Sequence, residues 1–184
     1  MKFSKLTVQT SFDSPLGRIL LAAHGERLAG VWFVGQSHLP EHSAWPEAPD
    51  HPVLQQARQQ LSDYLEGRRT AFDLPLDLDS GTPFQQAVWH ALQHIPRGTT
   101  CSYGALAEAI GKPGAVSGRA VGAAVGRNPL SIIVPCHRVL SARGGLTGYA
   151  GGLVRKISLL QLEGAAFQRV PASRTQLLLP QGSH

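Results

Sequence analysis

The spacing of apolar residues changes once along this chain, and that change limits the folds it can adopt. Apolar and polar residues alternate over residues 6–34, with turn-forming runs of Asp, Ser, Pro and Gly between the alternating stretches. This pattern is typical of an antiparallel strand meander. After a loop, Asp50 as N-cap and Pro52 in the first turn predict a helix whose apolar stripe extends to Gly67. The first part of the chain therefore predicts an α/β domain made of a meander and one helix.

Beyond residue 79 the apolar residues mostly follow helical spacing. The run Thr82-Pro83-Phe84-Gln85 is a capping-box pattern and predicts a helix that ends before Pro96. Residues 102–110 and 118–126 predict two short helices across a glycine-containing turn, as in a helix-turn-helix. Residues 131–134 predict a short buried strand, and residues 156–162 a last helix ending at Gly164. We expect a mostly α C-terminal domain with a winged-helix-like helix-turn-helix.

Charge is divided unevenly along the chain. Residues 1–78 contain 7 Lys and Arg against 9 Asp and Glu, whereas residues 79–184 contain 10 against 3. Residues 71–78, one more strand or an extended link, precede this change. The predicted domains are therefore residues 1–78 and 79–170, followed by a flexible tail at 171–184. A basic second domain suits a nucleic-acid backbone, although many basic proteins bind none.

Composition also limits the location and the cofactors of the protein. No apolar run approaches the ~20 residues of a membrane helix, and the N-terminus lacks a signal-peptide pattern, so we expect a cytoplasmic protein that contacts no membrane. Two cysteines, Cys101 and Cys136, form neither a disulfide framework nor a metal knuckle. His90 and His94 lie four residues apart, but the Glu of a zinc-hydrolase motif is missing between them. We therefore expect no metal and no cofactor.

Cys136 is the first candidate for chemistry, because His137 and Arg138 follow it directly after the predicted buried strand. Both neighbours could lower the pKa of its thiol. An isolated cysteine is more often a small buried hydrophobe, and the two flanking residues weaken that alternative. Since adjacent extended residues point to opposite faces, His137 would reach the sulfur through a bend or a bridging water. Glu163 could orient the imidazole, or could simply be solvated.

Three glycines, Gly118, Gly122 and Gly126, recur every fourth residue in the second short helix. They leave one helix face without side chains, at a cost of about 1 kcal/mol each. Close helix packing and contact with a nucleic-acid backbone or groove explain this face equally well. Arg119, at the start of the helix, is well placed for the second explanation.

The segment from Ile133 to Val139, Ile-Val-Pro-Cys-His-Arg-Val, resembles the active-site signature of the O6-alkylguanine-DNA alkyltransferase family, also called methylated-DNA–protein-cysteine methyltransferases. Further segments resemble that family in the same order: Ser102-Tyr103-Gly104, Arg119-Ala120-Val121-Gly122, Asn128-Pro129, Gly148-Tyr149-Ala150-Gly151-Gly152 and Glu163-Gly164. The resemblance covers residues 79–165. The first domain is also similar to that of the family, but its sequence is less diagnostic.

The resemblance implies direct-reversal DNA repair in a single turnover. Cys136 would displace the alkyl group of O6-alkylguanine, with O4-alkylthymine as a second substrate, and would keep it irreversibly. His137 would act as base through a water molecule, and Glu163 would orient the imidazole. Asn128 would brace the turn that carries the cysteine.

The same resemblance implies how the protein meets double-stranded alkylated DNA. The helix of small residues would enter the minor groove, and its DNA-binding residues would include Ala120, Gly122 and Arg127. Tyr103 would contact the flipped guanine and its phosphate, while Arg119 would fill the gap in the base stack. The substrate pocket would be formed by Val125, Val139, Tyr149 and Ala150, with Val139 contributing its backbone. We expect a monomer, and cooperative binding along DNA stays open. The link at residues 114–118 is slightly longer than is usual in the family.

Three other functions fit parts of the pattern. An alkyltransferase-like protein would recognise the lesion without chemistry, but it would carry another residue in place of Cys136. A Cys-His hydrolase would need an oxyanion hole and turnover on an ester or peptide. A helix-turn-helix regulator would need sequence-specific binding, and the Pro-Cys-His-Arg segment would have no role in it.

Overall fold

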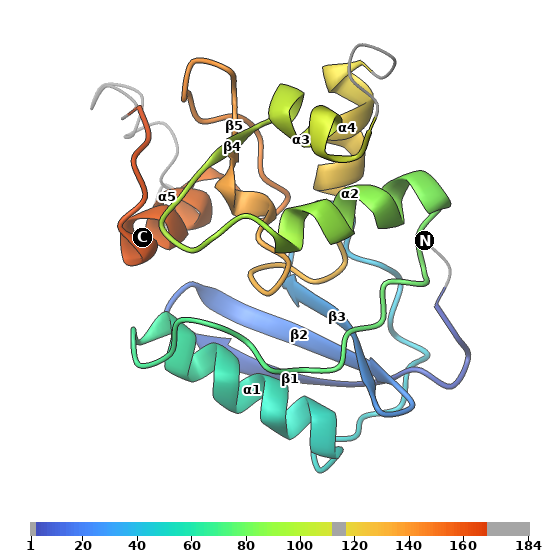
Figure 1. Ribbon diagram of the computed structural model, residues 1–184. Helices are drawn as coiled ribbons and strands as arrows, with labels where there is room; N and C mark the ends of the chain where they lie inside the picture. Colours follow the sequence, from blue (N-terminus) through green and yellow to red (C-terminus); the bar gives the residue numbers. More distant parts are fainter. Residues whose placement is uncertain (1–2, 112–116, 169–184) are drawn as a thin grey trace, which may run out of the picture.

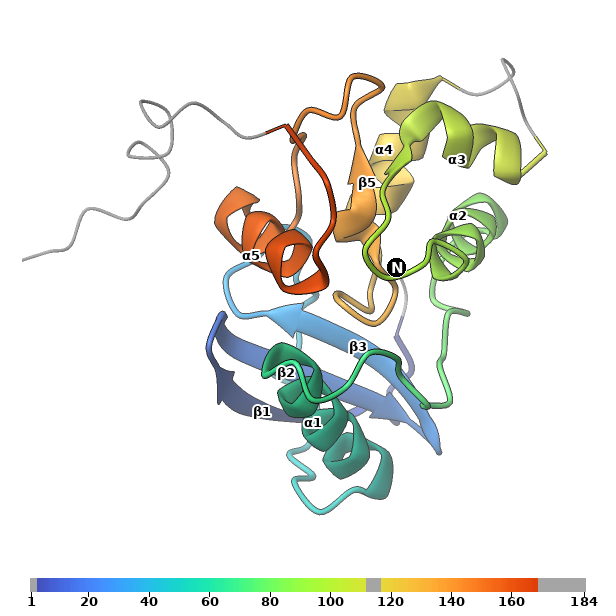
Figure 2. The same ribbon diagram turned by 60° about the vertical axis from the view of Figure 1, so that its left-hand side comes forward.

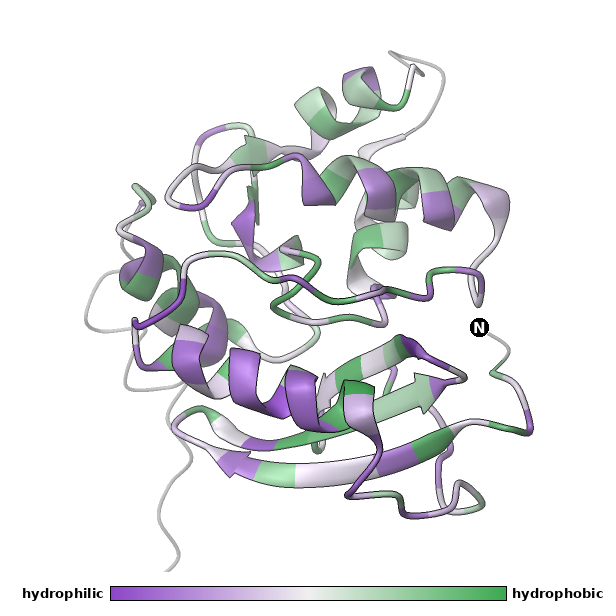
Figure 3. Cartoon of the chain, turned by 60° about the horizontal axis from the view of Figure 1, so that its bottom comes forward, coloured by the Kyte–Doolittle hydropathy of each residue, from purple (hydrophilic) through white to green (hydrophobic). Residues whose placement is uncertain are grey.

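The computed structural model, which describes residues 3–111 and 117–168, begins with an antiparallel sheet of three strands. These are β1 (Val8–Ser14), β2 (Gly17–His24) and β3 (Arg27–Phe33), paired in the order β1-β2-β3. The helix α1 (Pro52–Leu65) packs against all three strands, and Figure 1 shows it below the sheet. Figure 3 shows that this helix carries both hydrophilic and hydrophobic residues, and its buried residues recur at helical spacing. The predicted meander and helix are confirmed.

The two faces of the sheet bury different clusters, because successive side chains of a strand point to opposite sides. Ile19, Leu21 and Ala23 of β2 belong to the main core, which α1 and the C-terminal helices share. Leu20 and Ala22 pack instead with Trp32, against which Phe3 and Trp45 lie. The main core is therefore continuous between the two parts of the chain.

The C-terminal part is mostly helical, as predicted. It contains α2 (Pro83–Gln93), α3 (Tyr103–Ala109), α4 (Gly118–Gly126) and α5 (Leu153–Glu163), and a short parallel pair, β4 (Cys101–Ser102) with β5 (Val139–Leu140). Figure 2 shows α2, α3 and α4 grouped together, with α5 beyond β5. The helix-turn-helix consists of α3 and α4. Residues 114–116 of the link that is longer than usual in the family, and the predicted tail at 171–184, lie outside the described residues.

The helix ends differ in detail from the sequence predictions. The N-cap of α1 is His51 rather than Asp50, with Pro52 at the first helical position. The last helix begins at Leu153, earlier than predicted, and ends as expected at Gly164, which is left-handed with φ +71°. The capping box of Thr82 and Gln85 is present at the start of α2.

The predicted strand at residues 131–134 is wrong, because this buried segment is a turn. The Val134 amide donates to the Leu130 carbonyl at 2.9 Å, which reverses the chain. Ile132 takes a left-handed conformation with φ +73°, uncommon for a β-branched residue. A short apolar run cannot by itself distinguish a buried strand from a buried turn.

The outer edge of β3 joins the two parts of the chain. Its Leu28 pairs with the extended link that ends the first part, because the Leu28 amide donates to the Pro75 carbonyl. Further along, the Val31 amide donates to the Pro129 carbonyl at 2.8 Å, and the Ser131 amide donates back to Val31 at 3.0 Å. The turn that leads to Cys136 is thus bonded directly to the N-terminal sheet. Among the described helices, none is long and apolar enough to cross a membrane.

We predict that Thr82→Ala lowers the free energy of unfolding by about 1 kcal/mol, because the Thr82 hydroxyl accepts from the Gln85 amide at the start of α2. Urea unfolding measures the change. Thr70→Ala, at an exposed position outside the helices, is the control and should cost less than about 0.5 kcal/mol. Equal losses in both variants would contradict the capping role.

Candidate active site

Cys136 begins a single 3-10 turn, Cys136–Arg138, at the end of the buried turn described above. Its side chain is buried, and the Asn128 amide nitrogen donates to its sulfur at 3.1 Å. The same nitrogen donates to the Val134 carbonyl at 2.8 Å, and the Asn128 side-chain oxygen accepts from the Leu130 amide at 3.0 Å. One buried asparagine thus fixes both the shape of the turn and the position of the sulfur.

The environment raises the pKa of the Cys136 thiol, contrary to the sequence expectation. Burial is the main cause, and it outweighs the hydrogen bond from Asn128 and the charge of Lys156, both of which favour the thiolate. Arg138 does not supply its charge to the sulfur, because its guanidinium bonds to Glu163 instead. The resting sulfur is therefore a thiol that needs a base.

Glu163, the last residue of α5, is the centre of a buried hydrogen-bond network. Its Oε1 accepts from His137 Nε2 at 2.5 Å, from an Arg138 nitrogen at 3.2 Å and from the Tyr64 hydroxyl. Its Oε2 accepts from Arg138 Nε at 2.8 Å. Burial opposes the carboxylate charge, but the bonds from His137, Arg138 and Tyr64 outweigh it and lower the Glu163 pKa. The carboxylate is therefore ionised at neutral pH.

His137 is completely buried, and burial lowers its pKa despite the bond to Glu163. Its neutral ring donates Nε2–H to the carboxylate, which leaves the lone pair on Nδ1. Nδ1 makes no hydrogen bond with any described residue. The 3-10 turn that carries both Cys136 and His137 supplies the bend that an extended chain would lack.

Cys136 lies at a pocket of about 410 Å³ between the two domains. Tyr103 of α3 and Arg119, Gly122 and Val125 of α4 contribute to its lining. The other lining residues are Ser37, His38, Gly126, Gly148, Tyr149 and Ala150. A volume of this size fits a small organic group such as a nucleobase. A second cavity of about 290 Å³, partly lined by Tyr64 and Phe72, does not include Cys136 in its lining.

The glycine face of α4 is largely open among the described residues. A Cβ atom added at Gly118 or Gly126 would meet no described atom within 4 Å. At Gly122 it would meet only the Tyr103 ring, at an ordinary contact distance of 3.6 Å. Arg119 stands on the first turn of this helix and is exposed. The open face therefore favours the second of the two sequence explanations, contact with another molecule.

The loop at residues 144–152, which forms one wall of the pocket, is fixed from two sides. The buried Lys156 ammonium donates to the Val139 carbonyl at 2.7 Å and the Thr147 carbonyl at 3.2 Å, and burial lowers its pKa to about 8. From the N-terminal domain, the Ser37 amide donates to the Ala150 carbonyl at 3.0 Å. A Cβ atom at Gly151 would lie 2.7 Å from the Tyr149 ring and 3.0 Å from the Phe33 ring, so a larger residue here would force the Tyr149 ring to move.

The structure brings most of the expected site residues together. Cys136, Tyr103, Arg119, Gly122, Val125, Tyr149 and Ala150 line the pocket, and Asn128, His137 and Glu163 lie buried behind it. Val139 does not line the pocket and is completely buried on β5. Ala120 is half-buried in the first turn of α4, and Arg127 is its exposed C-cap residue.

Sequence reasoning missed four residues of the site region: Ser37 and His38 in the pocket wall, and Tyr64 and Lys156 in the buried network. Tyr64 belongs to the apolar stripe of α1, a position that is typical of a core residue. Lys156 interrupts the apolar stripe of α5, which is a detectable signal, since a lysine is rarely fully buried without partners. Ser37 and His38 carry no such signal. Within residues 3–111 and 117–168, no cluster of His, Cys, Asp and Glu is arranged to hold a metal ion.

Comparison with known proteins identifies relatives along nearly the whole chain. Residues 7–78 match the family model "6-O-methylguanine DNA methyltransferase, ribonuclease-like domain", and residues 83–165 match that of the DNA binding domain. A methylated-DNA–protein-cysteine methyltransferase of Mycobacterium leprae is 50% identical over 153 residues, which cover 83% of this chain and 90% of the relative. The constitutive protein of that name from Bacillus subtilis is 42% identical, covering 86% of this chain and 96% of the relative. The Mycobacterium tuberculosis protein named OGT, solved in complex with DNA, superposes with a TM-score of 0.77 at 49% identity, over 84% of this chain and 92% of that one.

We predict that Asn128→Ala raises the pKa of the Cys136 thiol further, because it removes the donor to the sulfur. A lost hydrogen bond of about 1 kcal/mol corresponds to a shift of up to about one pH unit. The rate of thiol alkylation by a small reagent, followed against pH in a Cys101→Ala background, measures this shift.

Ser131→Ala is the matched control, since it removes a buried hydroxyl that bonds to Gln36 at 3.3 Å rather than to the sulfur. An Asn128→Ala profile that coincides with the control profile would show that the amide has no influence on the sulfur.

Proposed function

Since the chain belongs to the 6-O-methylguanine DNA methyltransferase family, we propose that Cys136 is the cysteine that removes the alkyl group from damaged guanine. The protein repairs DNA by direct reversal, transferring an alkyl group from DNA to one of its own cysteines. The observation that carries the assignment is the position of the Cys136 sulfur, at the pocket and next to the His137–Glu163 pair. Cys101 lines no such pocket, and its thiol bonds to the Ser102 carbonyl.

The geometry supports an in-line displacement with a base behind the nucleophile. The thiol proton passes through a water molecule to His137 Nδ1, and Glu163 stabilises the imidazolium that results. The sulfur attacks the alkyl carbon as the bond from that carbon to O6 breaks. The electron pair of that bond goes to the guanine, which takes up one proton and leaves as the normal base. The new thioether is stable, so each protein molecule acts once.

The open face of α4 supports binding in the minor groove of double-stranded DNA. Backbones can approach closely where Gly118, Gly122 and Gly126 carry no side chain. The target base leaves the stack to reach the pocket, at a cost of a few kcal/mol. Arg119 fills the gap that the base leaves, and Tyr103, whose hydroxyl bonds to Thr147 at 2.9 Å, contacts the extruded nucleotide. Ala120 and Arg127 contact the DNA backbone at either end of the helix.

The pocket supports O6-alkylguanine as the main substrate and O4-alkylthymine as a second one. Val125 and Tyr149 lie beside the alkyl group, and the Ala150 backbone lies near O6, while the Val139 backbone contributes to recognition of the base edge. Residues 79–170 form the DNA-binding and transfer domain, and residues 1–78 form the N-terminal domain. The protein acts as a monomer in the cytoplasm, where reducing conditions keep both thiols free.

Incubation with duplex DNA that contains O6-methylguanine tests this function. We expect intact-protein mass spectrometry to find one methyl adduct per molecule and peptide mapping to place it on Cys136. Cys136→Ala should abolish transfer and retain most DNA binding, whereas the matched variant Cys101→Ala should transfer normally. Transfer by Cys136→Ala would refute the assignment, and tight lesion binding without an adduct on the wild-type protein would indicate recognition without chemistry.

We predict that Arg119→Ala slows transfer from duplex DNA roughly 5- to 150-fold, since a gap left in the stack raises the free energy of extrusion by about 1–3 kcal/mol. Transfer from the free nucleoside, which needs no extrusion, should be unchanged. Single-turnover rates with both substrates measure the difference. Arg18→Ala removes an exposed arginine of β2 and controls for the change of charge; an equal loss on both substrates for Arg119→Ala would exclude this role.

A further inference from the structure

One member of the buried network comes from the other domain. Tyr64 stands in the last turn of α1, and its hydroxyl reaches Glu163 across 99 positions of sequence. Its side chain is 1% exposed, so no bulk water competes for this hydroxyl. An Arg138 nitrogen lies 3.4 Å from the Tyr64 oxygen and donates to it. The catalytic network of the C-terminal domain is therefore completed by an N-terminal side chain.

The direction of the Tyr64–Glu163 bond is determined by the charges. The ionised Glu163 carboxylate can only accept, so the phenol donates. Burial and this bond raise the pKa of Tyr64 to about 12, which keeps the phenol protonated over the working range of pH. Tyr64 is thus a fixed, neutral donor.

Tyr64 and His137 donate to the same carboxylate oxygen, Glu163 Oε1. Each donor withdraws charge from that oxygen and weakens its attraction for the other. Without the phenol, Oε1 would attract the His137 Nε2 proton more strongly and would stabilise the imidazolium. The phenol therefore limits the basicity of His137 and fixes the rotation of the carboxylate.

We propose that Tyr64 is a positioning residue for alkyl transfer, which acts through Glu163 Oε1 to orient His137 and to tune its affinity for a proton. The inference rests on the proposed function of Cys136 and His137. It gives the N-terminal domain a part in the chemistry, besides its contribution to the pocket wall.

Other charged and titratable groups also face His137, and all remain in place when the phenol is removed. They are Glu163 and Lys156 from α5, Arg138 and Cys136 from its own turn, and Tyr149 from the pocket loop, whose ring centroid lies 6.5 Å from that of the imidazole. A change specific to Tyr64 therefore reports on the shared oxygen.

Tyr64→Phe tests the proposal, because it keeps the ring and removes only the hydroxyl. We expect one alkyl group per molecule on Cys136, as in the wild type. Loss of the hydroxyl should raise the pKa of His137, and protonated His137 cannot act as base. The acidic limb of the single-turnover rate against pH should therefore move to higher pH by about half a unit to one unit. Well below the limb this shift lowers the rate roughly 3- to 10-fold, and above it the two rates converge.

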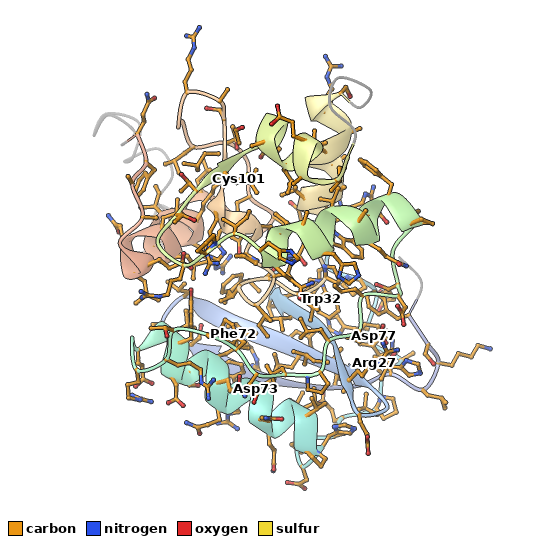
Figure 4. All side chains as sticks on the ribbon, viewed as in Figure 1. Arg27, Trp32, Phe72, Asp73, Asp77 and Cys101 are labelled. Carbon is orange, nitrogen blue, oxygen red and sulfur yellow. The ribbon has the colours of Figure 1, made fainter. Side chains whose placement is uncertain are left out.

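Phe72→Leu is the matched control. Phe72 packs against the Tyr64 ring, with centroids 4.7 Å apart, and lies on the link beside α1, where Figure 4 labels it. The control disturbs the same aromatic contact but leaves the hydroxyl, so its acidic limb should coincide with that of the wild type. A second variant, site-specific 3-fluorotyrosine at position 64, keeps the fold and makes the phenol a stronger donor. Its limb should move to lower pH.

Each outcome decides the matter. Opposite shifts in Tyr64→Phe and the fluorotyrosine variant support tuning through Glu163. Unmoved limbs in both, or a loss in Tyr64→Phe that is equal at every pH and matched by Phe72→Leu, overturn it in favour of a structural role. Should Tyr64→Phe fail to fold, the fluorotyrosine shift alone decides. Absence of an adduct on wild-type Cys136 would instead refute the proposed function itself.

Discussion

The buried carboxylate of Glu163 is the constraint on which the rest of the site depends. An ionised carboxylate away from water is tolerated only when its oxygens are saturated with donors. The donors come from the turn after Cys136 and from α1, so three distant segments converge on one residue at the end of α5. Arg138 also donates to the Ile95 carbonyl just after α2, which brings a fourth segment to the cluster. Because an unpaired buried carboxylate would cost much free energy, both domains must pack so that their donors reach Glu163, the residue that holds His137.

A second constraint acts on the sulfur. Burial raises the pKa of the Cys136 thiol and lowers that of the neighbouring imidazole. In the resting site the proton is therefore on the sulfur, and the imidazole is neutral. Such a thiol is less exposed to unwanted electrophiles and oxidants than a free thiolate would be. Asn128 and Lys156 favour the thiolate without producing it at rest. The arrangement suits the single transfer proposed for Cys136.

The N-terminal domain contacts the site in the C-terminal domain at three places. The edge of β3 bonds to the turn that leads to Cys136, Ser37 bonds to the pocket loop, and Tyr64 bonds to Glu163. These contacts therefore reach the turn that carries Cys136, the wall of the pocket and the carboxylate that holds His137. Meanwhile the face of α4 that meets DNA in the proposed complex is open at Gly118 and Gly126 and has only the Tyr103 ring beside Gly122 among the described residues. The buried hydrogen-bond network is therefore separate from the open face of α4.

The sequence alone determined the local elements and identified Cys136 as the candidate for the chemistry. Periodicity and caps predicted the meander and the helices, because these depend on neighbours in the chain, and the segment around Cys136 indicated the chemistry. The tertiary structure decided what depends on distant contacts. It made residues 131–134 a turn, since Asn128 and the β3 edge compete with a strand there. It also brought the Tyr64 hydroxyl to Glu163, 99 positions away in the sequence, and it raised the pKa of the Cys136 thiol through burial. Neither a distant partner nor burial leaves a local pattern in the sequence.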